Sequence, residues 1–299
     1  MEKVINQVDK ILHDGARKNS KELNNALIMP FSDDYPFCTN GVYFYCGKMG
    51  SGKTYGVIRH IMITDRFTNT PYYDSIVISA TSGTMDKTAK TFMSQVKAPV
   101  LKKDDKELMP YLMKNVKMKA KYYAIVEFVQ SKFEKISEEM EHILTKHQLR
   151  KLDGKFEYKK IAIYVVKKLN KYPFTKYPSN SLLVLDDYGG HDLLNDPRSP
   201  LANFITKVRH YNYTVVIMCQ TWRHICLNIK RLCTDFVIFQ GYSMRDFQSM
   251  IEQSGATEDW EELWNKYKEL PTPRSYMEVH IVAGKTDFKE VKQQKMTLF

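Results

Sequence analysis

Residues Gly47 to Thr54 have the types and the spacing that bind a chain of phosphates. The segment reads GKMGSGKT and fits the pattern G-x-x-x-x-G-K-[ST] at every fixed position. Its glycines let backbone N–H groups close around phosphate oxygens, and the helix expected after it adds a partial positive charge. Lys53 is expected to reach the β- and γ-phosphates, and the Thr54 hydroxyl to ligate Mg²⁺. The predicted nucleotide-binding residues are Gly47, Lys48, Met49, Gly50, Ser51, Gly52, Lys53 and Thr54.

Two adjacent carboxylates, Asp186 and Asp187, follow the apolar run SLLVL that begins at Ser181. A parallel strand that ends in acidic residues presents them at the edge of the sheet where ligands bind. We expect Asp186 to hold Mg²⁺ through water and Asp187 to orient or deprotonate the attacking water. An acidic cap after a buried strand is the alternative, and the phosphate loop upstream favours the functional interpretation.

Polar and cationic residues surround a third apolar run, TVVIMC at 214–219. Gln220 ends this run, and its amide either hydrogen-bonds a γ-phosphate or the attacking water, or caps a loop. Arg209 and Arg223 flank the run, and each is either a surface arginine or a charge donor to a phosphoryl group. The candidate catalytic residues are therefore Asp187, Gln220, Arg209 and Arg223, and the candidate Mg²⁺ ligands are Thr54 and Asp186.

Short apolar stretches alternate with helix-like segments along most of the chain. Strands that are apolar throughout are typical of a sheet covered by helices on both faces, so we predict an α/β fold with a mainly parallel sheet. The expected strands are 41–46, 75–80, 181–185, 214–219, 236–239 and 276–283, and the expected helices include 53–64 and about 201–211. We divide the chain into a helical lead-in at 1–35 and one domain at 36–299, which contains a Lys-rich helical insertion at 84–175.

The positive charge is concentrated in one part of the chain. The 299 residues carry 45 Lys+Arg against 34 Asp+Glu, a formal net charge of +11. Residues 97–176 hold 19 lysines and Arg150 against 10 acidic residues, which accounts for +10 of that total. Such a surface favours polyanions such as nucleic acid, because each neutralised phosphate releases a counterion. A solvated, lysine-rich helical surface is the alternative interpretation.

Composition argues against several classes of protein. The longest apolar runs are about five or six residues, too short for a transmembrane helix. The first residues lack the apolar core of a secretory signal, so we expect an intracellular protein with no membrane segment. The five cysteines contain no C-x-x-C pair, which disfavours a disulfide framework or a zinc ribbon. No ligand spacing relates the histidines considered, which are His60, His191, His210 and His224.

Together these motifs resemble the additional-strand class of P-loop ATPases. Within that class the chain is similar to the FtsK/HerA superfamily, and most of all to the genome-packaging ATPases of large double-stranded DNA viruses and virophages. The resemblance rests on GKMGSGKT at 47–54, SLLVLDD at 181–187, KVRHYNYTVVIMCQTWRH at 207–224 and NIKRLCTDFVIFQGYS at 228–243. The pair Asp186 and Asp187 matches the poxvirus-type packaging branch, whereas cellular translocases usually have Asp-Glu.

The resemblance implies an additional-strand sheet and a ring-forming motor. Such a motor hydrolyses ATP with Mg²⁺, forms a homo-oligomer of five or six subunits and packages double-stranded DNA into a preformed capsid, with capsid proteins at the packaging vertex as partners. Arg209 lies eleven residues before Gln220, which is the family's spacing for an arginine that reaches the neighbouring subunit's site. Arg223 is the alternative for that role. The implied location is the host cytoplasm, a viral factory or the virion.

Three other functions share parts of this pattern. A nucleoside or nucleotide kinase would use the same phosphate loop on a small acceptor and would have no role for Gln220. A GTPase-like switch would require Asn-Lys-x-Asp, whereas Asn265-Lys266 is followed by Tyr267-Lys268. A motor of the same superfamily that exports single-stranded DNA or partitions DNA shares all the core motifs. Its preference for single or double strands would distinguish it.

Overall fold

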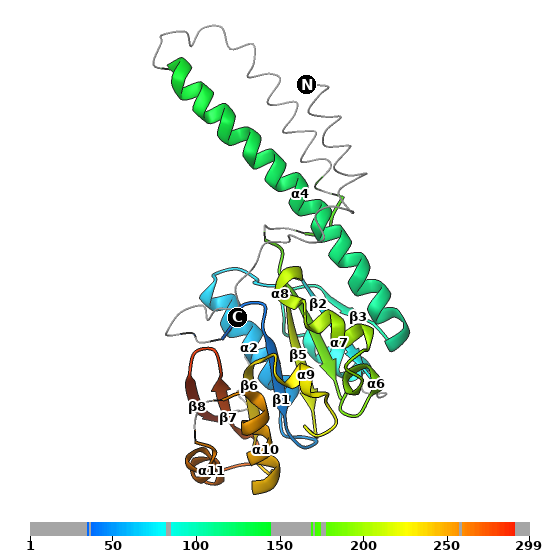
Figure 1. Cartoon of the computed structure of the whole chain (residues 1–299), viewed down its shortest axis with the longest axis vertical. Coiled ribbons are helices and arrows are strands. Elements are labelled where there is room, and N and C mark those ends of the chain that lie inside the picture. The colour runs from blue at the N-terminus through cyan, green and yellow to red at the C-terminus, as the bar shows by residue number, and fades with distance from the viewer. Residues whose placement is uncertain are drawn as a thin grey trace. The chain divides into compact units, whose positions relative to one another are not determined.

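The computed structural model describes residues 35, 37–81, 85–144, 169, 171–174, 178–256 and 259–290 (Figure 1). The chain divides into two compact units, one formed by Met1–Asn24 and Leu112–Ser179 and the other by Asn25–Tyr111 and Asn180–Phe299. The lead-in predicted at 1–35 lies outside the described residues except for Tyr35, and so do residues 145–168 of the predicted insertion.

The larger unit contains all the strands that the structure describes. These strands are β1 (Val42–Cys46), β2 (Ser75–Ala80), β3 (Val100–Lys102), β4 (Ser181–Asp186), β5 (Tyr213–Cys219), β6 (Cys233–Phe239), β7 (Ser275–His280) and β8 (Lys285–Glu290). Its helices are α2 (Lys53–Phe67), α3 (Met85–Met93), α6 (Asp192–Asn195), α7 (Pro200–Ile205), α8 (Val208–Tyr211), α9 (Leu227–Lys230), α10 (Met244–Ser254) and α11 (Trp260–Lys268). One long helix, α4 (Asp105–Leu144), begins in this unit and continues into the other.

The strands form an eight-stranded sheet in the order β3-β2-β4-β5-β1-β6-β7-β8. Six neighbouring strands, from β3 to β6 in that order, are parallel, and β7 and β8 continue the sheet in antiparallel pairing. The predicted mainly parallel α/β sheet is confirmed. Strand β5 pairs with β1 on one side and with β4 on the other, which is the additional-strand order. The carboxyl ends of these three parallel strands, at Cys46, Asp186 and Cys219, therefore lie at one edge of the sheet.

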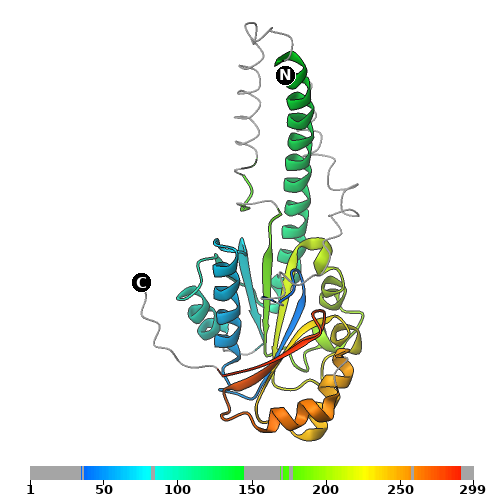
Figure 2. The same ribbon diagram turned by 90° about the vertical axis from the view of Figure 1, so that its left-hand side faces the viewer.

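Helices cover both faces of the sheet, as the continuous apolar character of its strands requires. On one face, Tyr43 and Tyr45 of β1 belong to a buried cluster with Ile58 of α2 and Phe92 of α3. On the other face, Phe44 of β1 packs edge-on against Trp222, with ring centroids 4.8 Å apart. Figure 2 shows α2 and α3 on one side of the sheet and the helices that follow β4 on the other. Trp222 is buried.

Three sequence predictions were wrong in detail. The helix expected at 201–211 is two short helices, because the amide of Lys207 bonds to the carbonyl of Phe204, three residues back, and closes α7. The strand expected at 276–283 ends at His280, and β8 follows at 285–290, where no strand was expected. The insertion expected to be helical from residue 84 contains β3, whose three residues pair with β2. A three-residue strand is too short to show a periodicity of its own.

The described part of the smaller unit is mainly helix α4, which lies within the insertion that the sequence predicted to be helical. Leu112, Val116, Ala120 and Tyr123 are buried along one face of this helix, at the spacing of successive turns. The hydroxyl of Tyr123 donates to the carbonyl of Ser179 and accepts from its amide, each at 2.8 Å. Among the described residues, no helix has the length and apolar character needed to span a membrane.

Candidate nucleotide-binding site

The loop between β1 and α2 has the backbone of a phosphate-binding loop. Gly50 and Gly52 have φ values of 77° and 105°, in the left-handed region that favours glycine. Gly52 is the N-cap of α2, and no side-chain hydrogen bond caps it, so the first-turn amides of this 15-residue helix are not capped by a side chain. A Cβ on Gly47 would lie 2.4 Å from Oγ of Ser51, so the loop needs glycine at that position as well. The partly buried Thr54 follows in the first turn of α2.

Lys53 folds back over this loop. Its Nζ donates hydrogen bonds to the carbonyl oxygens of Gly47, at 2.6 Å, and of Lys48, at 3.1 Å. Burial lowers the pKa of Lys53, and the charges of nearby Asp186 and Asp187 oppose that effect. The ammonium is thus fixed beside the loop and within electrostatic reach of the carboxylates that follow β4.

Asp186 ends β4 and contacts helix α3. The hydroxyl of Thr88 donates to Oδ2 of Asp186 at 2.7 Å. Burial raises the pKa of Asp186, whereas the hydrogen bond from Thr88 and the charge of Lys53 lower it. These opposing effects describe a partly desolvated carboxylate that is stabilised by one hydroxyl and one ammonium group.

Asp187 has a strained backbone that its neighbours hold in place. Its φ of 60° is in the left-handed region, which costs about 1–2 kcal/mol for a residue with a Cβ. Its amide donates to the carbonyl of Met218 on β5 at 3.0 Å, and its carbonyl accepts from the Thr81 hydroxyl at 2.8 Å. Oδ1 accepts from Nε2 of Gln220 at 3.2 Å. The hydrogen bonds to Met218 and Thr81 hold the strained backbone of Asp187 in place, and the bond from Gln220 orients its carboxylate.

The end of β5 links the phosphate loop to Asp187. The amide of Gly47 donates to the carbonyl of Cys219 at 3.1 Å, and the next residue, Gln220, contacts Asp187. Tyr242, which follows β6, donates through its hydroxyl to the carbonyl of Gln220 at 2.8 Å. The sequence-predicted loop, Asp186, Asp187 and Gln220 are therefore brought together at one edge of the sheet.

The two candidate arginines lie elsewhere. Arg209 is exposed on α8, before β5 begins, so the seven residues of β5 separate it from Gln220 by about 23 Å. The guanidinium of Arg223 forms an ion pair with Asp246 at 2.7 Å and lines a cavity of about 290 Å³ with Gln220 and Tyr242. Among the described residues, neither arginine forms a hydrogen bond or an ion pair with the phosphate loop.

Sequence reasoning missed Thr81, Thr88 and Tyr242, whose hydroxyls donate hydrogen bonds to Asp187, Asp186 and Gln220, respectively. Thr81 and Tyr242 follow strands β2 and β6, so a polar residue just past a strand end was the available signal. Thr88 lies within a helix whose sequence gives no indication that it faces Asp186. Only the pairing of β2 with β4 brings α3 to that carboxylate.

A phosphate loop, paired carboxylates on β4 and a polar residue on an intervening strand define a P-loop NTPase of the additional-strand class. The model of the Poxvirus A32 protein family matches residues 112–268, more than half of the chain. The chain belongs to this family, which confirms the resemblance to the poxvirus-type packaging branch. The matched range includes Asp186, Asp187, Arg209 and Gln220 and lies downstream of the phosphate loop.

Several solved structures match the chain at low sequence identity and with TM-scores below 0.5. The genome packaging NTPase B204 from Sulfolobus turreted icosahedral virus 2, in complex with ATP-gammaS, is 10% identical, with a TM-score of 0.45 over 84% of this chain and 96% of that chain. The DNA-packaging ATPase B204 from Sulfolobus turreted icosahedral virus is 12% identical, with a TM-score of 0.46 over 85% and 99%. The pCW3 conjugation coupling protein TcpA is 12% identical, with a TM-score of 0.40 over 85% and 68%. No curated protein matches the chain.

Proposed function

We propose that this protein is a Mg²⁺-dependent ATPase that moves double-stranded DNA into a preformed viral capsid. The observation that carries the proposal is the convergence of the phosphate loop, Asp186, Asp187 and Gln220 at one edge of the sheet, in a chain of the poxvirus A32 family. A nucleoside triphosphate bound at the loop would have the partly buried Lys53 at its phosphates and a fixed carboxylate beside its terminal phosphoryl group.

The residues at the loop match the needs of a magnesium nucleotide. Backbone amides at the start of α2 and the ammonium of Lys53 would bind the β- and γ-phosphates. The Thr54 hydroxyl and the Asp186 carboxylate offer hard oxygen ligands, the kind that Mg²⁺ prefers. Mg²⁺ held there would neutralise the charge that develops between the β- and γ-phosphates.

Hydrolysis requires a group that positions the attacking water. In the proposed reaction the water oxygen bonds to the γ-phosphorus, the bond from that phosphorus to the bridging oxygen breaks, and the proton of the water passes to the Asp187 carboxylate. The hydrogen bond from Gln220 holds this carboxylate in one orientation. ADP and inorganic phosphate then leave, and the proton returns to solvent.

The position of Arg209 favours a ring of subunits as the active form. This side chain is exposed and about 23 Å along β5 from Gln220, so within one subunit it is remote from the nucleotide site. We infer that it completes the site of a neighbouring subunit in a ring of five or six. The formal charge of +11 favours a DNA partner, and capsid proteins at a packaging vertex would be the docking partners. The host cytoplasm, a viral factory or the virion is the corresponding location.

The test is the steady-state ATPase rate of the full chain, with and without linear double-stranded DNA. We expect duplex DNA to raise the rate and Lys53→Ala to abolish it. Lys268→Ala, which removes an exposed lysine from the last turn of α11, should leave the rate unchanged. Stimulation by single-stranded DNA alone would favour an export motor. Lys53-dependent phosphorylation of a nucleoside, indifferent to DNA, would establish a kinase and overturn the proposal.

A further inference from the structure

A histidine and three carboxylates meet on one face of the antiparallel part of the sheet, away from the nucleotide site. Glu278 and His280 are two residues apart on β7, so their side chains lie on the same face. Asp287 of β8 pairs directly with Glu278, and Asp235 of β6 pairs directly with His280. Strand register therefore gathers the four side chains into one cluster.

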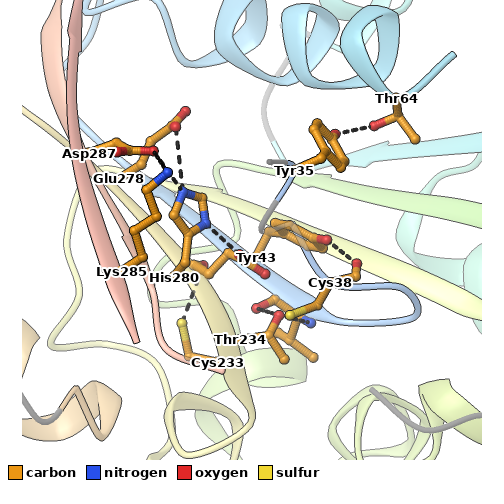
Figure 3. Close-up of polar contacts among 12 residues, drawn as sticks. Tyr35, Cys38, Tyr43, Thr64, Cys233, Thr234, Glu278, His280, Lys285 and Asp287 are labelled. Atoms are coloured by element: carbon orange, nitrogen blue, oxygen red, sulfur yellow. Dashed lines mark hydrogen bonds and ion pairs between the residues drawn. The ribbon is translucent and has the colours of Figure 1, made fainter. Parts of the chain in front are cut away.

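The imidazole of His280 is oriented by one carboxylate and directed at two others. His280 is fully buried, and its Nδ1 lies 2.9 Å from Oδ1 of Asp235, itself buried. Its Nε2 lies 3.8 Å from Oε2 of Glu278 and 3.8 Å from Oδ2 of Asp287 (Figure 3). This Nε2 makes no hydrogen bond within the part of the chain that the structure describes. A buried ring nitrogen is thus aimed between two carboxylate oxygens without a partner of its own.

We propose that Glu278, His280 and Asp287 bind a divalent transition-metal ion of the zinc class. One oxygen of each carboxylate and Nε2 of His280 lie within 4.8 Å of one another. A tetrahedral zinc site with bonds of about 2.0 Å places its ligands about 3.3 Å apart, so each 3.8 Å separation needs to shorten by about half an ångström. A nitrogen with carboxylate oxygens suits Zn²⁺ better than Mg²⁺, which takes oxygen ligands.

Asp235 has the position of an orienting residue for such a site. A ligating histidine usually donates its other ring N–H to a carboxylate, which fixes the tautomer and the direction of the ring. With Nδ1–H donated to Asp235, the lone pair of His280 is on Nε2, the atom that faces Glu278 and Asp287. Asp235 is therefore the carboxylate partner that a metal-binding histidine usually has.

Two lysines on β8 form ion pairs with the carboxylates of the cluster. Nζ of Lys285 lies 3.5 Å from Oδ2 of Asp287, and Nζ of Lys289 lies 3.7 Å from the same atom and also pairs with Glu278. The side chains of Lys285 and Lys289 are 47% and 32% exposed, so both ammonium groups have a path to solvent. An ion at the cluster would compete with these lysines, and removal of one lysine should tighten metal binding.

A bound ion would stabilise the edge of the sheet. Strand β8 is the last in the sheet order, and the proposed ligands join it to β7, while Asp235 extends the connection to β6. Binding to the folded state alone stabilises that state, so metal should raise the unfolding temperature. This site and its effect are independent of nucleotide hydrolysis.

The experiment is a calorimetric titration of the metal-free full chain with ZnCl₂, in the absence of nucleotide and Mg²⁺. We expect one Zn²⁺ per chain and a higher unfolding temperature. Glu278→Gln and Asp287→Asn should each weaken binding at least about tenfold. Lys285→Met should tighten it about twofold to fivefold, the range of an exposed ion pair. Glu262→Gln is the matched control: it also removes a carboxylate that pairs with a lysine, Lys266 on α11, but outside the cluster, so zinc affinity should not change.

Several results would overturn the proposal. The absence of saturable zinc binding would leave the cluster as an ion-pair network of Glu278 and Asp287 with Lys285 and Lys289. Binding at unchanged affinity in both Glu278→Gln and Asp287→Asn would place the ion elsewhere. X-ray absorption at the zinc edge should show nitrogen and oxygen ligands, and sulfur ligands would assign the ion to cysteines instead. None of these results bears on the ATPase test, which uses Mg²⁺ and Lys53.

Discussion

The sharpest prediction about the nucleotide site concerns Thr88. Its hydroxyl donates to Oδ2 of Asp186 at 2.7 Å, and Thr88→Val removes that donor with little change in shape. A hydrogen bond to a charged group contributes about 1.5–3 kcal/mol, because the partly buried carboxylate otherwise lacks the solvation it had in water. If Asp186 holds Mg²⁺, this corresponds to a loss of about 10- to 100-fold in kcat/KM at limiting Mg²⁺.

The same substitution should change the pH dependence. Burial raises the pKa of Asp186, and the hydrogen bond from Thr88 opposes that rise. Loss of the hydroxyl therefore raises the pKa further, so the carboxylate becomes protonated at a higher pH. Because the charged form is required to hold Mg²⁺, activity present above the pKa of Asp186 should disappear at a higher pH in Thr88→Val than in the wild type.

The assay is ATPase activity measured against Mg²⁺ concentration and against pH for two variants. Thr91→Val is the matched control, because the Thr91 hydroxyl lies on the same helix and donates to the carbonyl of Lys87, its one hydrogen bond among the described residues. We expect Thr88→Val to need more Mg²⁺ and to lose activity at a higher pH than Thr91→Val. Identical Mg²⁺ and pH profiles for the two variants would refute the role assigned to Asp186.

Two further predictions concern the ring and the loop. If Arg209 acts on a neighbouring subunit, Arg209→Ala and Lys53→Ala should each be inactive alone. Mixing the two variants should restore part of the ATPase rate, because some interfaces then join an intact lysine to an intact arginine. Mixtures as inactive as their components would contradict the role. Gly47→Ala should lower the free energy of unfolding by about 1–3 kcal/mol in chemical denaturation, because its Cβ would lie 2.4 Å from Oγ of Ser51. Gly189→Ala, with its nearest contact at 3.4 Å, should be nearly neutral, and an equal loss in both would contradict the steric argument.

The sequence determined the features that depend on neighbouring residues. The phosphate loop, the buried strands and the acidic pair after β4 are each encoded within a few consecutive residues. A glycine pattern or an apolar run has the same meaning wherever the segment lies in the fold. For that reason the α/β class was predictable from the sequence. The positions of Lys53, Asp186 and Asp187 at strand or helix ends were predictable for the same reason.

Only the tertiary structure decided which of these segments are neighbours. The position of β5 between β1 and β4 places Gln220 on Asp187, although 33 residues separate them in the chain. Thr88 reaches Asp186 because β2 pairs with β4 across a separation of about 100 residues. The cluster of Asp235, Glu278, His280 and Asp287 arises in the same way, from strand register. Register is set by the packing of whole strands in the sheet, and no short window of sequence contains that information.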